Sequence, residues 1–192
     1  PIIQRSTGGR AVLHGSDLTY SIVGDVRDTR FEGGIIETYR MISQGFISFF
    51  QKLGLSPQIQ PHSPRRKTSK SHVCFMTPSA YEILIDQKKI IGSAQRQKSK
   101  AFLQHGTIPI YNQIPILEKI FLKSTRESLQ NELTSLESTG VLTQYSLHEI
   151  IQILLDSFQE TFELSWTKHT WTPIEQNAIQ KQLSHFQPKS FF

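Results

Sequence analysis

The spacing of apolar residues predicts helices in several parts of the chain. In residues 31–53 apolar side chains recur at steps of three, four and seven, and Gly54 follows the last of them, as glycine often does after a helix. A second apolar stripe covers residues 146–158, behind a serine cap and a glutamate three positions later. Residues 172–183 open with a similar cap and a proline at the first helical position. A more polar helix is expected over residues 124–136.

Shorter runs rich in β-branched and aromatic residues predict strands. The expected strands are residues 11–13, 17–23, 81–85, 89–94, 101–103 and 162–166. The polar residues 86–88 between two of these runs are typical of a hairpin turn, so residues 81–103 are interpreted as a small antiparallel meander. Together the patterns predict an α+β fold in which a mixed or antiparallel sheet is packed by helices.

Length and composition fit one domain. With 192 residues, of which 37% are hydrophobic and 19% charged, the chain can bury a core and is too apolar for a disordered protein. We therefore expect a single domain over residues 1–192, with residues 146–192 as its helical C-terminal portion. The chain begins with Pro1 rather than methionine, which suggests that the N-terminal part of the domain is missing.

The charge and the motifs that are absent narrow the class of function. A net charge of +5 favours acidic partners. The basic residues are not interleaved with aromatic ones as in a nucleic-acid platform, so no nucleic acid is expected. No apolar run approaches ~20 residues and no signal peptide is visible, so we expect a cytoplasmic protein without a membrane span. The single cysteine excludes an internal disulfide, and no zinc, P-loop or dinucleotide motif occurs.

Two polar segments are candidates for binding a ligand or a partner, and each also has a purely structural explanation. The turn Gly8-Gly9, flanked by Arg5 and Arg10, is able to cradle a carbonyl or a phosphate, or it is an ordinary turn. The basic loop at 65–70 is either solvated or a docking surface for an acidic protein.

The centre of the chain holds a thiol and an amine in apolar surroundings. Cys74 lies between Val73 and Phe75, where an isolated cysteine is commonly an inert core residue but also a possible nucleophile. Lys89 begins an apolar strand and is able to extend its amine from the strand end. The small residues at 92–94 suggest close packing against that strand.

Four motifs together carry a resemblance to a known family. RSTGGRAVLH at 5–14, KIIGSAQRQ at 89–97 and LQHGTI at 103–108 resemble, in order, the glycine-rich loop, the Lys-x-x-Gly-Ser-Ala motif and the His-Gly strand of the biotin/lipoate protein ligase superfamily. CFMTPSAYEI at 74–83 is most similar to the cysteine-dependent octanoyl-[acyl-carrier-protein]:protein N-octanoyltransferases of that superfamily. One departure is Gln4, where the family usually has a second arginine before the loop.

The resemblance implies the biotinyl/lipoyl protein ligase catalytic fold, which is similar to that of class II synthetases, and a set of site residues. Cys74 would accept the acyl group and Lys89 would be the family's active-site lysine. His14 would line the pocket or orient an intermediate rather than act as a base. The expected acyl- and substrate-binding residues are Gly8, Gly9, Arg10, Ala11, His14, Gly92, Ser93, Ala94, Gln104, His105 and Gly106.

The resemblance also implies the partners and leaves alternatives open. The donor would be octanoyl-acyl carrier protein, and the acceptor a lipoyl-domain protein such as glycine cleavage H protein or a 2-oxoacid dehydrogenase acyltransferase subunit. Neither a cofactor nor a metal is expected, because a thioester donor is already activated. The alternatives are an ATP-dependent lipoate–protein ligase acting through lipoyl-adenylate, a lipoyl amidotransferase, and a non-catalytic homologue that binds an acyl carrier or a lipoyl domain.

Overall fold

A computed structural model describes residues 2–8, 11–60, 81–121 and 126–186, and all structural statements concern these residues. They form two antiparallel sheets. The larger sheet has the strand order β1-β6-β5 and the smaller the order β2-β3-β4. The strands are β1 (Asp17–Asp25), β2 (Gln58–Ile59), β3 (Ile83–Ile85), β4 (Lys88–Lys89), β5 (Gly92–Gln97) and β6 (Ala101–Pro109).

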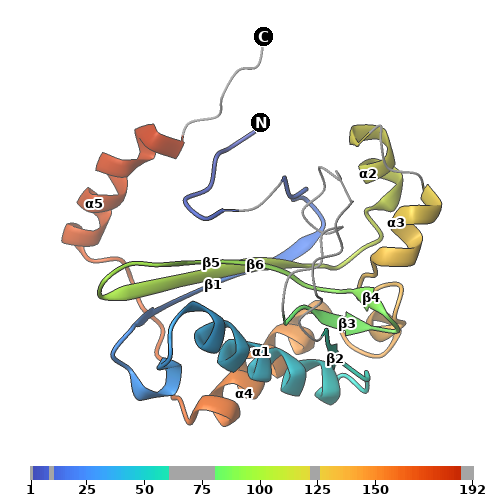
Figure 1. The fold of residues 1–192 in the computed structure, drawn as a ribbon, viewed down its shortest axis with the longest axis horizontal. Helices are drawn as coiled ribbons and strands as arrows, with labels where there is room; N and C mark the ends of the chain where they lie inside the picture. The colour runs from blue at the N-terminus through green and yellow to red at the C-terminus, as the bar shows by residue number, and fades with distance from the viewer. Residues whose placement is uncertain (1, 9–10, 61–80, 122–125, 187–192) are drawn as a thin grey trace.

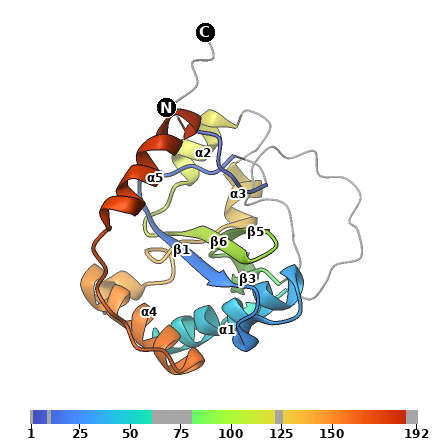
Figure 2. The same cartoon turned by 90° about the vertical axis from the view of Figure 1, so that its left-hand side faces the viewer.

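Helices lie on both sides of the larger sheet. They are α1 (Ile35–Lys52), α2 (Ile114–Ile120), α3 (Arg126–Glu132), α4 (Leu147–Phe162) and α5 (Pro173–Leu183). Short 3-10 turns occupy Thr29–Phe31, Val141–Thr143 and Ser184–Phe186. Helices α1 and α4 cover one face of the sheet, while α2, α3, α5 and the N-terminal segment lie beyond the other face (Figures 1 and 2).

The main core lies between the larger sheet and the helix pair α1–α4. Tyr20 of β1 packs its ring 4.6 Å from that of Phe46 in α1, and Phe46 packs 4.9 Å from Phe158 in α4, measured between ring centroids. The alternation of β1 explains the contact, because Leu18, Tyr20 and Ile22 all pack against this core. We call the side of the sheet that carries these residues the core face and the other side the upper face.

The register of the larger sheet assigns each residue to one of these faces. Gly106 of β6 pairs with Tyr20 on one side and with Ser93 on the other. A Cβ atom added to Gly106 would lie 2.2 Å from the carbonyl oxygen of Gly92 and 2.7 Å from the Tyr20 ring, so only glycine fits. The next pair along, Ser21 with His105, belongs to the upper face because successive residues of a strand alternate.

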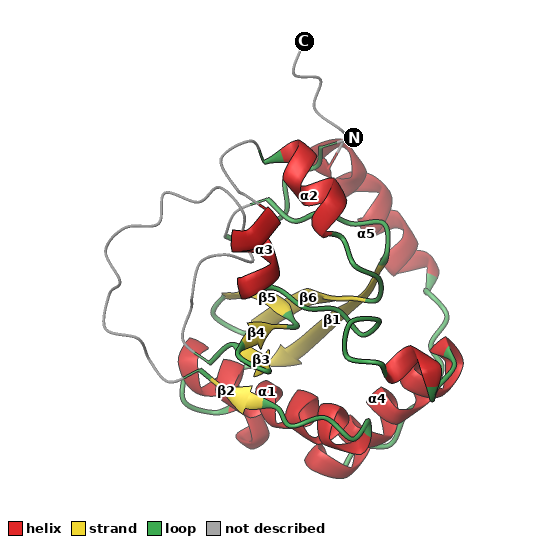
Figure 3. Cartoon of the chain, turned by 90° about the vertical axis from the view of Figure 1, so that its right-hand side faces the viewer, coloured by secondary structure: helices red, strands yellow, loops and turns green. Residues whose placement is uncertain are grey.

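The smaller sheet lies beyond the end of the larger one (Figure 3). Strands β3 and β4 form a tight hairpin whose turn residues Asp86 and Gln87 both have positive φ angles, 48° and 65°. After Lys89, the buried residues Ile90 and Ile91 carry the chain into β5 and thus into the other sheet. The predicted meander over residues 81–103 is therefore wrong in one respect, because its hairpin and its last two strands belong to different sheets.

Most of the predicted helices are confirmed. The capping boxes at Ser146 and Thr172 are both present, each with reciprocal bonds to the glutamate three positions later. The helix predicted from residue 31 starts later, because Gly33 and Gly34 have φ angles of 110° and 95° and separate a 3-10 turn from α1. The polar helix predicted for 124–136 is shorter, and its first two residues lie outside the described part.

Two of the predicted strands are wrong. Residues 11–13 make no strand and line a cleft instead. Phe162 is the last residue of α4, and Glu163 ends that helix in a left-handed conformation with φ 52°. The chain then turns back on the helix, where the Trp166 indole donates to the Leu155 carbonyl at 2.9 Å. Residues 163–166 therefore pack against α4 and do not pair with a strand. The basic loop at 65–70 lies outside the described residues. Among the helices of the described segments, none has the length and apolarity to cross a bilayer.

Candidate active site

Lys89 holds a buried positive charge at the point where the two sheets meet. The β3–β4 hairpin places it opposite Leu84, and its Nζ lies 2.5 Å from Oε1 of Glu82. Both residues are only 5% exposed. A buried ammonium is tolerated when a counter-charge and hydrogen bonds replace its water. The Glu82 carboxylate supplies that counter-charge and fixes the position of the amine.

His105 lies on the upper face of β6, beneath the N-terminal segment. The Thr7 hydroxyl approaches its Nε2 atom to 2.6 Å, and the Arg96 guanidinium donates to the carbonyl oxygen of Ser6 at 2.8 Å. Partial burial lowers the pKa of His105, and the charges of Arg5 and His14 lower it further. His105 is therefore favoured as a neutral imidazole, held in contact with the segment that carries the predicted glycine loop.

A second histidine on this side of the sheet is held by a carboxylate. His14 Nδ1 lies 2.7 Å from Asp17 Oδ2, and the Thr107 hydroxyl donates to the same oxygen. The backbone N–H of Gly15 donates to the other carboxylate oxygen at 2.8 Å. Burial by itself would raise the pKa of Asp17, but these hydrogen bonds outweigh it and the pKa is lowered. Asp17 is thus an ionised, oriented acceptor.

Two of the predicted binding residues point to the core face instead. The Tyr20 hydroxyl donates to Ser93 Oγ at 2.5 Å, and the Gln104 amide donates to the Tyr20 oxygen at 3.4 Å. Gln104 is 1% exposed, and burial raises the pKa of Tyr20 to about 12. Ser93 and Gln104 therefore belong to a polar cluster between the sheet and α1, on the opposite side of the sheet from His105.

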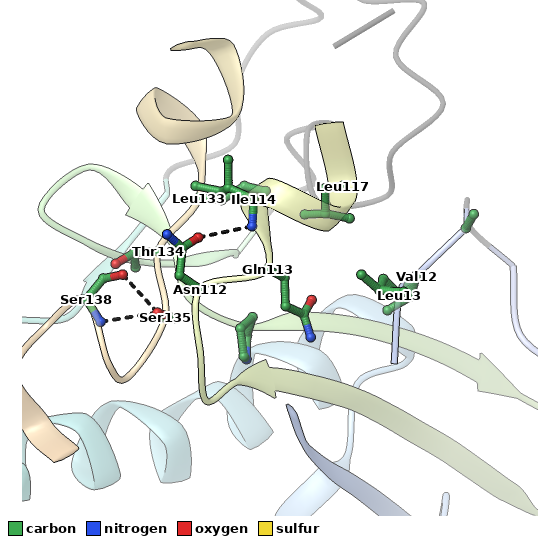
Figure 4. Close-up of a pocket in the computed structure, with 12 residues that line it drawn as sticks. Val12, Leu13, Asn112, Gln113, Ile114, Leu117, Leu133, Thr134, Ser135 and Ser138 are labelled. Atoms are coloured by element: carbon green, nitrogen blue, oxygen red, sulfur yellow. Dashed lines mark hydrogen bonds between the residues drawn. The ribbon is translucent and has the colours of Figure 1, made fainter. Parts of the chain in front are cut away.

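A cleft opens between the N-terminal segment, the end of β6, helix α2 and the residues that follow α3 (Figure 4). About 460 Å³ of space lies in and in front of this cleft, and because that volume includes open solvent, the enclosed part is much smaller. Its apolar walls come from Ala11, Val12, Leu13, Ile114, Leu117 and Leu133. The cleft is tied to Lys89, because the Thr134 N–H donates to the Lys89 carbonyl at 3.1 Å and Leu133 forms a parallel bridge with Lys89.

The predicted site residues are thus distributed over three places. Ala11, Val12 and Leu13 line the cleft, and His14 is the next residue along the chain. Ala94 pairs with His105 on the upper face, whereas Gly92 and Gly106 provide close backbone packing between β5 and β6. A Cβ atom added to Gly8 would meet nothing within 4 Å. Cys74, Gly9 and Arg10 lie outside the described residues.

The sequence patterns alone missed the acidic partners of the site. A carboxylate inside the apolar run at 81–85, across a predicted hairpin from Lys89, was the signal for Glu82. Asp17 gave a weaker signal, because it stands three positions after His14 at the start of a strand. In the described part of the chain, no group of three His, Cys, Asp or Glu side chains is arranged to hold a metal ion.

Comparison with known proteins places this chain in a family. Residues 1–159 match the lipoyl protein ligase A/B catalytic domain. Octanoyltransferase LipM of Carboxydothermus hydrogenoformans is 33% identical over 189 residues, covering 95% of this chain and 69% of that protein. Octanoyltransferase LipM of Bacillus cereus is 34% identical over 169 residues, covering 84% of this chain and 60% of that protein.

A solved structure supports the fold independently. The crystal structure of lipoate-protein ligase A bound with ATP superposes with a TM-score of 0.73 at 22% identity, over 95% of this chain and 67% of that one. The chain spans 60% to 69% of the length of the two curated relatives. The resemblance drawn from the four motifs is confirmed, and the chain belongs to the family of the lipoyl protein ligase A/B catalytic domain, together with the LipM octanoyltransferases.

Proposed function

We propose that this chain transfers an octanoyl group to a lysine of a lipoyl domain through a thioester on Cys74, as a step of protein lipoylation. The observation that carries the proposal is the combination of LipM similarity with the buried, ion-paired Lys89. The thiolate of Cys74 attacks the thioester of the donor, the donor thiol leaves, and the acceptor amine then displaces the enzyme thiolate to give the amide.

Lys89 serves this chemistry as a fixed positive charge. An ammonium close to the reacting atoms favours the thiolate over the thiol and stabilises the oxyanion of each tetrahedral intermediate. Because Glu82 and the β3–β4 hairpin already hold the amine, little reorganisation is needed when charge develops. The proposal requires the thiol of Cys74, nine positions before the start of β3 in the sequence, to reach this charge.

The apolar cleft would take part of the eight-carbon chain of the acyl group. Each methylene buried there would stabilise the complex by roughly 0.8 kcal/mol. The cleft wall at Leu133 and Thr134 is bonded to the backbone of Lys89, so an acyl chain in the cleft would lie on the same part of the fold as this lysine. Ala11, Val12 and Leu13 would close the opposite wall.

The donor and the acceptor are proposed from the same family relationship. Octanoyl-acyl carrier protein is the proposed donor, and glycine cleavage H protein or a 2-oxoacid dehydrogenase acyltransferase subunit is the proposed acceptor. The reaction would take place in the cytoplasm. The net charge of +5 would speed the encounter with acidic partners.

Intact-protein mass spectrometry after mixing with octanoyl-acyl carrier protein tests the proposal. The chain has one cysteine, so an octanoyl adduct that hydroxylamine removes must be on Cys74. We expect this adduct on the native protein and none on Cys74→Ala. Transfer of the octanoyl group to a lipoyl domain would complete the test.

Other results would assign another activity. No adduct from a fully octanoylated donor would overturn the transferase proposal. Lipoyl-adenylate formation from lipoate and ATP would then identify a ligase, and an adduct formed only from an octanoylated lipoyl domain would identify an amidotransferase. Binding without any of these reactions would identify a non-catalytic homologue.

A further inference from the structure

Two glutamines lie side by side on the core face of the larger sheet. Gln95 of β5 pairs with Gln104 of β6, and Gln95 shares a face with Ser93, which stands two positions before it in the same strand. Gln104 is 1% exposed, and the amide nitrogen and oxygen of Gln95 are also buried. Together with Ser93 and Tyr20, whose hydroxyls are bonded to each other, the two glutamines form a polar cluster next to the core.

Three polar atoms of the two amides have no hydrogen-bond partner among the described residues. They are Nε2 and Oε1 of Gln95 and Oε1 of Gln104. Gln104 uses only its Nε2, which donates to the Tyr20 oxygen over a long 3.4 Å. A direct bond between the two amides would use one polar atom of each, and it would still leave the other atom of Gln95 without a partner.

The side chains that border this polar cluster do not supply the missing partners. Phe46 packs on the Tyr20 ring and Ile22 is the cross-strand neighbour of Gln104, and both are apolar. Two hydroxyls of α1 are buried nearby in the core layer, those of Thr38 and Ser43, but each donates to a backbone carbonyl four residues earlier. Desolvating an amide without replacing its hydrogen bonds is costly, so buried amides are rarely left in this state.

We propose that the polar cluster binds at least one ordered water molecule between Gln95 and Gln104. A water donates two hydrogen bonds and accepts two, and a buried water typically makes about three. This water would donate to the Oε1 atoms of both glutamines and accept from the Ser93 hydroxyl, whose oxygen already accepts from Tyr20. The Nε2 of Gln95 would donate to a second water.

The chemistry of the cluster selects a neutral guest. Its members are two amides and two hydroxyls, and burial raises the pKa of Tyr20 to about 12, so the phenol is neutral at physiological pH. An ion bound here would be buried without a counter-charge from the cluster, which is strongly unfavourable. A water requires hydrogen bonds only, and the cluster offers both donors and acceptors.

The water site lies directly behind a part of the candidate active site. Gln104 precedes His105 and Ser93 precedes Ala94, and His105 and Ala94 pair on the upper face. A bridging water would connect β5 to β6 through side chains in addition to the backbone ladder. The inference is independent of the proposed function, because it concerns hydrogen bonds within the free protein.

Two measurements on the whole chain test the inference. A high-resolution crystal structure should show a water oxygen about 2.7–3.2 Å from an amide atom of each glutamine. In solution, magnetic relaxation dispersion of the water signal counts the buried waters that exchange slowly with bulk.

A double variant and a matched control make the solution measurement specific. Gln95→Met with Gln104→Met keeps the length of both side chains and removes both amides, so it should lose at least one slowly exchanging water relative to the native protein. Gln159→Met, at an exposed position of α4, should keep the native number.

The inference is overturned if the crystal structure shows no water within hydrogen-bond distance of either amide, or if the double variant retains the native number of slowly exchanging waters. If the double variant does not fold, the crystal structure of the native protein decides alone. Neither measurement uses a substrate, so failure of the proposed transfer reaction would leave this result unchanged.

Discussion

Removing the carboxylate of Glu82 should destabilise the fold strongly. Glu82 and Lys89 are each 5% exposed and meet at 2.5 Å, so Glu82→Gln removes the carboxylate charge that faces a buried ammonium. Breaking a buried ion pair by removing one partner costs about 3–5 kcal/mol of unfolding free energy. For a chain of this size, each kcal/mol lowers Tm by roughly 2–4 °C, so we expect a loss of about 6–20 °C.

Two controls separate this effect from the ordinary cost of a mutation. The double variant Glu82→Leu with Lys89→Met removes both charges and keeps the volume, so its stability should return to within about 1 kcal/mol of the native protein. The exposed pair Lys52–Glu160, at 2.7 Å with side chains 34% and 64% exposed, is the surface counterpart. Glu160→Gln should cost less than about 1 kcal/mol, because water solvates the remaining lysine.

Urea unfolding followed by circular dichroism gives the free energies for all four proteins. The reasoning fails if Glu82→Gln costs no more than Glu160→Gln, or if the double variant loses as much stability as Glu82→Gln. A stable double variant also provides a test of chemistry, since it should fold and yet form octanoyl-enzyme slowly for lack of the Lys89 charge.

Three further predictions concern the sheet and its helices. Gly106→Ala should cost about 3 kcal/mol or more by urea unfolding, because its Cβ would meet the Gly92 carbonyl oxygen, and that oxygen cannot move without breaking the β5–β6 pairing. The pKa of Tyr20 should be about 12 in a spectrophotometric titration. Because this folded pKa exceeds the unfolded value of 10.0, the stability that the neutral phenol contributes is complete below pH 10 and is lost as the pH rises toward 12. Tyr20→Phe should remove this loss of stability at high pH. Ser146→Ala removes the cap of α4 and should cost about 1 kcal/mol, which a thermal melt would detect.

The parts of the fold that local rules determine were predictable from the sequence. The stripes of α1 and α4 and the caps at Ser146 and Thr172 depend on neighbouring residues only, and all are confirmed. The division of the meander was not predictable, because Ile90 and Ile91 look like strand residues whichever sheet they join. What decides is the long-range pairing of β5 with β6 and of β4 with β3.

The charged partners in the candidate site were also not predictable, because they depend on long-range contacts. Short motifs identified Lys89, His14 and His105. They did not reveal Glu82 and Asp17, the carboxylates that hold Lys89 and His14. Glu82 is seven positions before Lys89, and only the hairpin brings them together. Thr107 lies 90 positions from Asp17, and only the β1–β6 register shows that both serve the same face.

The Glu82–Lys89 pair sets the proposed chemistry beside a charge that the fold already holds. Lys89 is buried beside Glu82, and the β3–β4 hairpin fixes its position before any substrate binds. A positive charge held in this way suits the proposed stabilisation of a thiolate and of an oxyanion, because little has to move when negative charge develops. An exposed lysine would be screened by water and would lose much of this effect.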